Sequence, residues 1–269
     1  MGKINKNNYR AKAKNQTICQ WVSGTYFCID DNKNNPFNTL PIKRQHFIVS
    51  YCSGDWNMGG WDNIEILLGT LQQNTGLKDE NEKDIFEGDI LRVYTQVSYD
   101  EDGECTVGTE YKEGVVIYEN GAFKLHNGMY LHEIEPSFEY KVYIIENVID
   151  SKNNSIAIDY RMNLLCDNFN NNRLDDYPNM IDLAFLDLAK NAAKIPMDDF
   201  VCSYDVYNSD MNIIFIRNGI RFILSEYIKE NNNDEFDERY EITCSTGGCN
   251  SNNFNDIIEF VEKRCKKNF

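Results

Sequence analysis

The chain has 269 residues, enough for one large or two ordinary domains, and its many apolar and aromatic residues can fill a sizeable core. Its net charge of −16 disfavours direct binding to duplex DNA, because an acidic protein repels phosphate. The N-terminus is polar with no apolar stretch behind it, which predicts neither a signal peptide nor a membrane span. We therefore expect a cytoplasmic protein.

The charge is unevenly distributed along the chain. Residues 1–50 carry eight Lys or Arg and two Asp, whereas residues 51–150 carry 21 acidic and six basic residues. From Lys3 to Asn15 cations alternate with Asn and small residues, which suggests a mobile or edge-lying arm more than a core element. The cations of this basic arm are Lys3, Lys6, Arg10, Lys12 and Lys14.

The first half of the chain is typical of β-structure. Ile18–Ile29 predicts a pair of strands broken at Ser23-Gly24, and His46–Tyr51 predicts a short strand. Asn120-Gly121 joins two apolar runs, and such a pair favours a type I′ hairpin because both residues accept a positive φ. Asn218-Gly219 predicts a second hairpin of this type in the second half.

The polar run Ser151–Ser155 is the predicted boundary between domains 1–150 and 151–269. Beyond it, two segments place apolar residues at helical spacing, one ending at Pro196 and the other running from Phe254 to Cys265. Two or three strands are expected between these helices, with Ser245–Cys249 as a loop before the last helix. The fold class is therefore α+β, with a β-rich first domain and a smaller α+β second domain.

Two short motifs carry a family resemblance. Thr75–Asp79 has the sequence Thr-Gly-Leu-Lys-Asp, and Glu87–Leu91 has the sequence Glu-Gly-Asp-Ile-Leu. An Arg-x-Lys at Arg10 and a Gly-x-Val-x-Tyr strand at Gly114–Tyr118 accompany them. Together these features resemble those of YopX-like phage proteins. The resemblance covers about residues 10–150. It implies a phage or prophage protein, acting in the host bacterial cytosol, whose first domain is an SH3-like or partly open β-barrel.

The motif is explained by backbone geometry without catalysis. We expect Gly88 to take a positive φ at a corner of the sheet and Asp89 to accept hydrogen bonds in a turn. Glu82 stands where the family usually has Gly, so the turn is expected to close with Asn81 or in a looser conformation.

No catalytic, metal or cofactor site is predicted. The nine Cys are scattered, with no Cys-x-x-Cys pair, and are expected to be reduced. His126, His132 and Glu133 could form an acid/base cluster if the segment between them turns, but no nucleophile stands at a recognisable spacing. Asp100–Glu104 resembles the start of a calcium loop but lacks the Glu that would close it.

The leading functional hypothesis is a non-enzymatic phage accessory protein that binds a host protein complex with a basic or nucleic-acid-binding surface, such as a nuclease-type anti-phage defence complex. Exposed carboxylates would imitate the phosphates of nucleic acid. The residues assigned to this acidic surface are Asp79, Glu80, Glu82, Asp84, Asp100, Glu101, Asp102 and Glu104. A solubilising face, a homo-oligomer and a nucleic-acid-associated regulatory or replication module that uses the basic arm remain alternatives.

Overall fold

The computed structural model describes residues 9–14, 20–30, 44–52, 60–94, 97–99, 105–107, 110–133, 140–172, 181–205, 210–230 and 236–266. The chain divides into two compact units, Met1–Ile145 and Glu146–Phe269. No helix in the described part of the chain is both long and apolar enough to cross a membrane.

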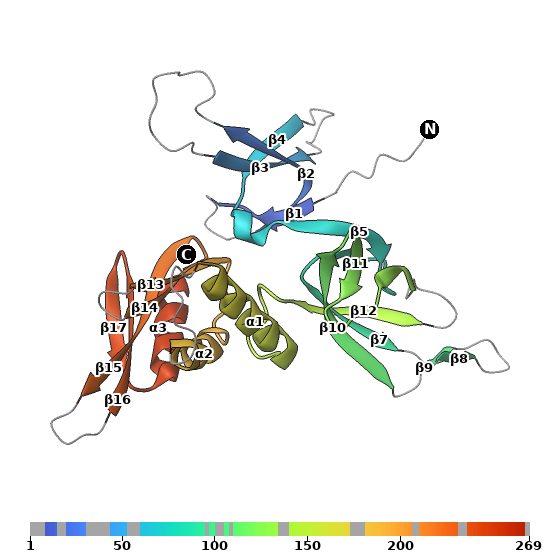
Figure 1. Ribbon diagram of the computed structural model, residues 1–269. Helices are drawn as coiled ribbons and strands as arrows, with labels where there is room; N and C mark the ends of the chain where they lie inside the picture. Colours follow the sequence, from blue (N-terminus) through green and yellow to red (C-terminus); the bar gives the residue numbers. More distant parts are fainter. Residues whose placement is uncertain are drawn as a thin grey trace. The chain divides into compact units, whose positions relative to one another are not determined.

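Unit 1 is built of strands (Figure 1). Its elements are β1 (Tyr9–Lys12), β2 (Trp21–Asp30), β3 (Arg44–Cys52), β4 (Gly60–Glu65), η2 (Leu68–Thr70), β5 (Gln72–Lys78), β6 (Asp84–Phe86), β7 (Asp89–Tyr94), β8 (Val97–Tyr99), β9 (Cys105–Val107), β10 (Tyr111–Glu119), β11 (Ala122–Leu125), η3 (Leu131–Glu133) and β12 (Lys141–Asn147).

These strands form open sheets. The larger has the order β4-β3-β2-β1-β5-β6, the smaller has the order β11-β10-β7-β12, and β8 pairs with β9. One apolar cluster, which includes Leu91, Val116 and Val142, belongs to the smaller sheet, and a second, Ala11, Ile48 and Ile66, belongs to the larger. The described strands close no barrel, and the expected β-rich first part is confirmed.

Strand β2 corrects the prediction of a strand pair broken at Ser23-Gly24. The strand runs unbroken from Trp21 to Asp30, and Gly24 is buried within it. A Cβ at Gly24 would lie 2.0 Å from the carbonyl oxygen of Val49 on β3. Glycine is therefore required for the close approach of two backbones and does not mark a turn.

Strand β1 corrects the prediction of a mobile or edge-lying arm. It pairs on one side with β2, where Ala11 is opposite Val22, and on the other with β5, where Tyr9 is opposite Gln73. Ala11 is fully buried. This part of the basic arm is an interior strand of the larger sheet.

Both predicted type I′ hairpins are confirmed. Asn120 and Gly121 have φ values of 53° and 84° between β10 and β11, and Asn218 and Gly219 have φ values of 50° and 75°. The second pair joins β14 to β15 in unit 2.

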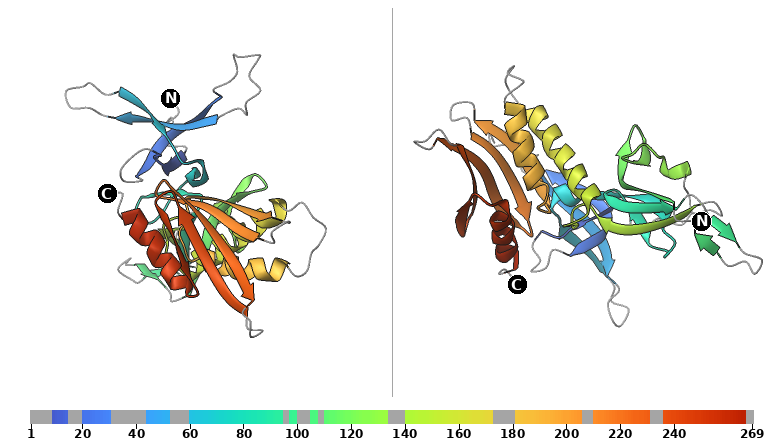
Figure 2. Two further views of the ribbon diagram at one scale, coloured as in Figure 1. Left: turned by 90° about the vertical axis from the view of Figure 1, so that its left-hand side faces the viewer. Right: turned by 90° about the horizontal axis from the view of Figure 1, so that it is seen from below.

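Unit 2 is an antiparallel sheet with three helices. Its elements are α1 (Ser155–Asn172), α2 (Ile181–Ala192), β13 (Asp199–Asp205), β14 (Asp210–Arg217), β15 (Ile220–Glu230), β16 (Phe236–Cys244), β17 (Gly247–Ser251) and α3 (Phe254–Lys266). The five strands lie in chain order, and the helices cover one face of the sheet (Figure 2).

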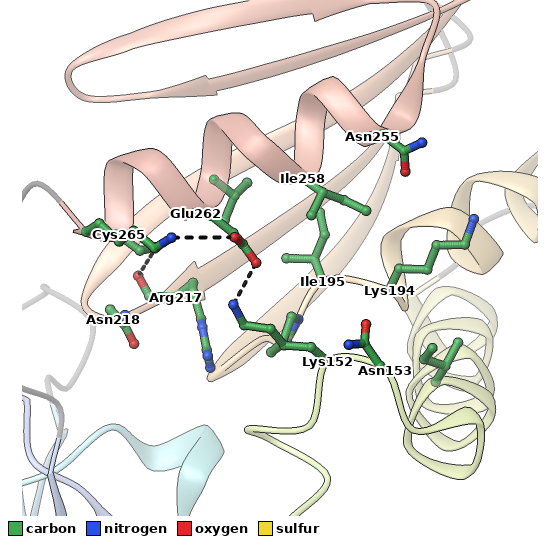
Figure 3. A pocket seen from close by; sticks show the side chains of 14 residues that line it. Lys152, Asn153, Lys194, Ile195, Arg217, Asn218, Asn255, Ile258, Glu262 and Cys265 are labelled. Carbon is green, nitrogen blue, oxygen red and sulfur yellow. Dashed lines mark hydrogen bonds and ion pairs between the residues drawn. The ribbon is translucent and has the colours of Figure 1, made fainter.

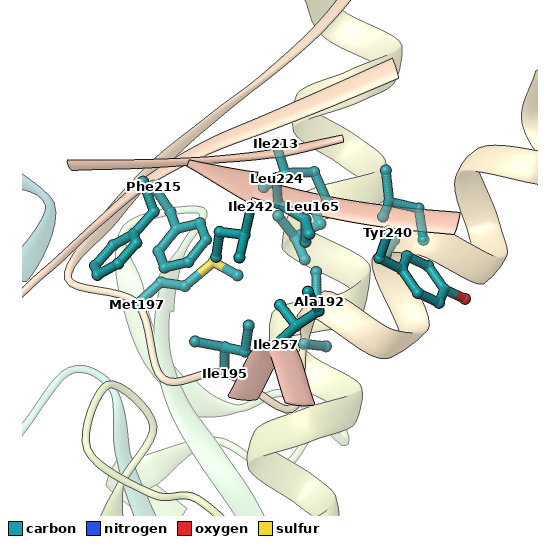
Figure 4. Close-up of a cluster of buried hydrophobic side chains, with 14 of the residues drawn as sticks. Leu165, Ala192, Ile195, Met197, Ile213, Phe215, Leu224, Tyr240, Ile242 and Ile257 are labelled. Carbon is teal, nitrogen blue, oxygen red and sulfur yellow. The ribbon is translucent and has the colours of Figure 1, made fainter. Parts of the chain in front are cut away.

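The core of unit 2 lies between that sheet face and the helices (Figure 4). Alternate residues of the central strands point into it, among them Ile213, Phe215 and Leu224, because side chains along a strand alternate between its two faces. Ile257 of α3 and Ala192 of α2 close it from the helix side. The predicted helical stripe of the last segment is thus confirmed.

The α+β class of the second part is confirmed, but it has more elements than expected. α1 was not predicted from the sequence, and the described sheet has five strands where two or three were expected. The predicted loop Ser245–Cys249 overlaps strand β17, Gly247–Ser251, which pairs with β16.

Candidate binding surfaces

Two features of the family resemblance, the Arg-x-Lys at Arg10 and the Glu87–Leu91 motif, meet in an ion pair in unit 1. The guanidinium of Arg10 on β1 pairs with the carboxylate of Asp89 at the start of β7. Arg10 Nε also donates to Gln72 at 2.8 Å, and the guanidinium lies over the ring of Phe86, 4.3 Å from its centroid. Asp89 is 1 % exposed and accepts a hydrogen bond from the backbone N–H of Phe86. The ion pair therefore links β1 of the larger sheet to β7 of the smaller sheet, and Asp89 is a hydrogen-bond acceptor, as expected.

Asp79 organises the turn that follows β5. It is 3 % exposed, and its carboxylate accepts backbone N–H groups of Asn81, Lys83 and Ile144. Burial by itself would raise the pKa of Asp79, but these hydrogen bonds, with the Asn81 amide, outweigh burial and hold the pKa below its ordinary value. Asp79 is thus an interior turn residue and does not belong to the predicted acidic surface.

Glu82 corrects the predicted turn closure. It adopts a φ of 61°, in the left-handed region where the family usually has Gly, so the turn closes with Glu82 itself and not with Asn81. Its backbone N–H donates to the carbonyl oxygen of Asp79 at 3.0 Å.

Four described carboxylates between Asp79 and Glu119 pair with neighbouring cations. Lys141 Nζ lies 2.9 Å from Glu80, and Lys78 Nζ lies 3.4 Å from Glu82. The same holds for the pairs Arg92–Glu113 and Lys124–Glu119. Asp84 is half-buried at the start of β6. The other predicted acids, Asp100, Glu101, Asp102 and Glu104, lie outside the described residues.

The described cations of the basic arm are also part of the fold. Lys12 is 2 % exposed, with its ammonium 5.7 Å from the centroid of the Trp21 ring, and Lys14 pairs with Glu65. Arg10 is held by Asp89 as described above. Lys3 and Lys6 lie outside the described residues.

The described side chains do not support the predicted acid/base cluster of His126, His132 and Glu133. His126 Nδ1 accepts the backbone N–H of Val115 at 3.0 Å, which is a structural role at the end of the β10–β11 hairpin. The His132 ring lies beside Tyr130, 5.4 Å between centroids, and the side chain of Glu133 is not among those described. Within the described part of the chain no three His, Cys, Asp or Glu side chains gather as metal ligands.

An apolar face of the larger sheet was not predicted from the sequence. Residues directly opposite each other in the sheet share a face, so the register places Phe27 and Phe47 together, with Ile29 and Val49 on the same side. On β4, Trp61 projects from this side and is 69 % exposed, and Ile29 is 45 % exposed. The opposite side carries Ile48, which is fully buried. We call Phe27, Ile29, Phe47, Val49 and Trp61 the apolar face.

The apolar face lies at an edge of the sheet. β4 is the terminal strand of the six, so its outer backbone groups have no strand partner among the described residues. Large exposed apolar side chains beside an open strand edge are typical of surfaces that bind another protein.

Unit 2 contains a cavity of about 620 Å³ (Figure 3). Its walls come from the segment before α1, the loop after α2, the β14–β15 turn and α3. Its charged lining consists of Lys152, Lys194, Arg217, Glu262 and Lys266. The sequence signal for this cavity was weak, because these cations are far apart in the chain.

Comparison with known proteins agrees with the first domain's motifs. The family model described as YopX protein matches residues 8–169. No curated protein matches the chain. Among solved structures, protein EF1440 from Enterococcus faecalis is similar at 19 % sequence identity, covering 52 % of this chain and 92 % of that chain with a TM-score of 0.29.

Proposed function

This chain belongs to the YopX family, a family of phage-type proteins, and we propose that it is a non-enzymatic phage accessory protein that acts by binding another protein. The target we propose is a host anti-phage defence complex of the nuclease type.

The apolar face is the observation that supports this proposal. Aromatic side chains are enriched at the buried centres of protein interfaces, where a few well-buried residues supply most of the binding free energy. Trp61 is 69 % exposed and Ile29 is 45 % exposed, so covering these side chains would remove apolar area from water, a gain of about 25 cal/mol per Å².

The acidic charge has a different role in this proposal. Because Glu80, Glu82, Glu113 and Glu119 are already paired with cations, we do not assign them as direct contacts. The net charge of −16 still produces a long-range field, which accelerates encounter with a basic nuclease surface. In this proposal the apolar face provides most of the affinity, and the net charge increases the rate of association.

A phage plating experiment tests the proposal. Bacteria that carry nuclease-type defence systems would express the wild-type chain, the double variant Trp61→Ser/Ile29→Ser, or a control variant, Val201→Ser/Ile223→Ser. The control also replaces two exposed apolar residues, Val201 and Ile223 of the unit 2 sheet, which are 51 % and 36 % exposed.

We expect the wild-type chain and the control to restore plating on at least one such strain, and the double variant to fail. No restoration by the wild-type chain on any strain would contradict the choice of target. If the double variant restored plating as well as the wild-type chain, the apolar face would not be the binding surface.

A further inference from the structure

The cavity of unit 2 has the size and lining of a small-molecule site. At about 620 Å³ it lies within the range of known ligand pockets. Ile195 and Ile258 lie beside each other on its apolar wall, which Ile158 and Pro196 extend. Asn153, Asn218 and Asn255 add amide groups that can both donate and accept hydrogen bonds.

The charged lining is cationic although the protein is strongly acidic. Four of its side chains are Lys or Arg and one, Glu262, is a carboxylate. Lys152 Nζ lies 2.6 Å and Lys266 Nζ lies 4.0 Å from the Glu262 carboxylate, so a single carboxylate forms ion pairs with two ammonium groups. Lys194 Nζ donates to the neutral amide oxygen of Asn191 at 2.9 Å.

Arg217 is the best-compensated cation of the lining. Its guanidinium lies 3.3 Å from Asp198 and 3.7 Å from Asp150, and it donates to the carbonyl oxygen of Ile149. Asp198 also accepts the backbone N–H of Asn218 at 2.6 Å, which fixes this corner of the cavity. Arg217 is therefore held in place before any ligand arrives.

Arg161 of α1 adds a buried positive charge beside the cavity. It is 5 % exposed, and its guanidinium donates to the carbonyl oxygens of Ala193, Val148 and Ser151. Ala193 and Ser151 directly precede the lining residues Lys194 and Lys152 in the chain. Burial, and secondarily repulsion from Arg217, lowers the pKa of Arg161 to about 10, so it stays charged at neutral pH.

The Arg161 guanidinium is incompletely satisfied. One terminal nitrogen, Nη2, has no hydrogen-bond partner among the described residues, and Nε and Nη1 donate only to neutral carbonyl oxygens there. An isolated buried cation is costly, and a nearby anion reduces that cost. Counting Arg161 and the two carboxylates that pair with Arg217, the cations of this region outnumber the carboxylates by five to three.

We propose that this cavity binds a small phosphate monoester of mononucleotide size, with its phosphate among Lys152, Lys194 and Lys266 and its organic body on the Ile195–Ile258 wall. A phosphate monoester carries close to two negative charges at neutral pH, which matches the excess of two cations. The three Asn amides can bond polar edges of the organic body. This site is separate from the apolar face and does not depend on the proposed function.

Calorimetric titration of the full chain tests the site, with adenosine 5′-monophosphate, inorganic phosphate and adenosine as probes. We expect the monophosphate to bind more tightly than inorganic phosphate, and adenosine to bind least. Lys194→Glu should weaken monophosphate binding by about tenfold or more, because it places a carboxylate where the anion lies. Lys190→Glu, four residues earlier on α2, exposed and outside the lining, is the matched control and should leave affinity unchanged within about twofold.

Glu262→Gln is expected to increase the affinity for the monophosphate, a result that misfolding of the variant would not produce. It removes the carboxylate of the lining and should tighten monophosphate binding by about threefold or more. Absence of binding by both phosphate-containing probes would overturn the proposal. So would adenosine binding as tightly as its monophosphate, or equal effects of Lys194→Glu and Lys190→Glu.

Discussion

At the scale of single residues, Glu82 holds a backbone conformation that favours glycine. We predict that Glu82→Gly stabilises the protein by about 0.5–1 kcal/mol, because relief of the positive φ exceeds the loss of the exposed Lys78 pair. Urea unfolding of the two proteins measures the difference. Asn81→Gly, at a neighbouring residue without a positive φ, is the control and should give no gain.

We predict that Asp79 makes the free energy of unfolding depend on pH. Its pKa is lowered in the folded state, so at pH values near 4 the unfolded state binds more protons. Its contribution is fully present above its ordinary pKa and is lost as pH falls through the folded-state pKa. Asp79→Asn should therefore cost about 1–3 kcal/mol at pH 7 and progressively less below pH about 4. Unfolding free energies that differ equally at pH 7 and pH 3 would contradict this assignment.

Because Arg10 and Asp89 form an ion pair, we predict that substitutions at these two residues have coupled effects on stability. Arg10→Met should cost about 3–5 kcal/mol, because it leaves the buried Asp89 carboxylate without its cation. In the double variant Arg10→Met/Asp89→Asn the loss should be smaller than the sum of the single losses. Additive losses in urea unfolding would mean that the pair is not a coupled unit.

The sequence predicted the chemistry of some of these residues but not their partners. Asp89 was correctly expected to be a turn acceptor, since Asp after Gly favours that role. Its pairing with Arg10, 79 residues earlier, depends on strand order, which local pattern does not reveal. Asp79 was assigned to the surface because a carboxylate in a polar turn is usually exposed, whereas here three backbone N–H groups compensate its burial.

At the scale of elements, Gly24 controls the pairing of β2 and β3. We predict that Gly24→Ala costs about 3 kcal/mol or more, because the new methyl group would overlap the Val49 carbonyl and separate the strands. Gly60→Ala on β4 is the control, since nothing lies within 4 Å of a Cβ there. Equal thermal unfolding midpoints for the two variants would contradict the close approach.

Strong local signals were sufficient for some elements and misleading for others. The Asn-Gly hairpins and α3 were predicted because turn chemistry and helical spacing agree there. α1 was missed because its Asn residues are weak helix formers, although Ile158, Leu165 and Phe169 lie at helical spacing and contribute to the unit 2 core. β1 was missed because its cations resemble a solvated arm, while its interior position comes from pairing with two distant strands.

At the scale of the whole molecule, we propose the apolar face, and not the acidic residues, as the surface that binds another protein. Glu80, Glu82, Glu113 and Glu119 each pair with a cation, whereas Trp61 and Ile29 of the apolar face are exposed. That face could not be recognised from the sequence, because Phe27, Phe47 and Trp61 look like core residues until the register shows which side of the sheet they share.

Affinity capture from host lysate, read by quantitative mass spectrometry, tests the central claim most directly. The baits are the wild-type chain, Trp61→Ser/Ile29→Ser, and the control Val201→Ser/Ile223→Ser. We predict that a nuclease-type defence component is enriched by the wild-type chain and the control and lost, by about tenfold or more, with the apolar-face variant. Equal enrichment by all three baits, or no defence component with the wild-type chain, would contradict the account.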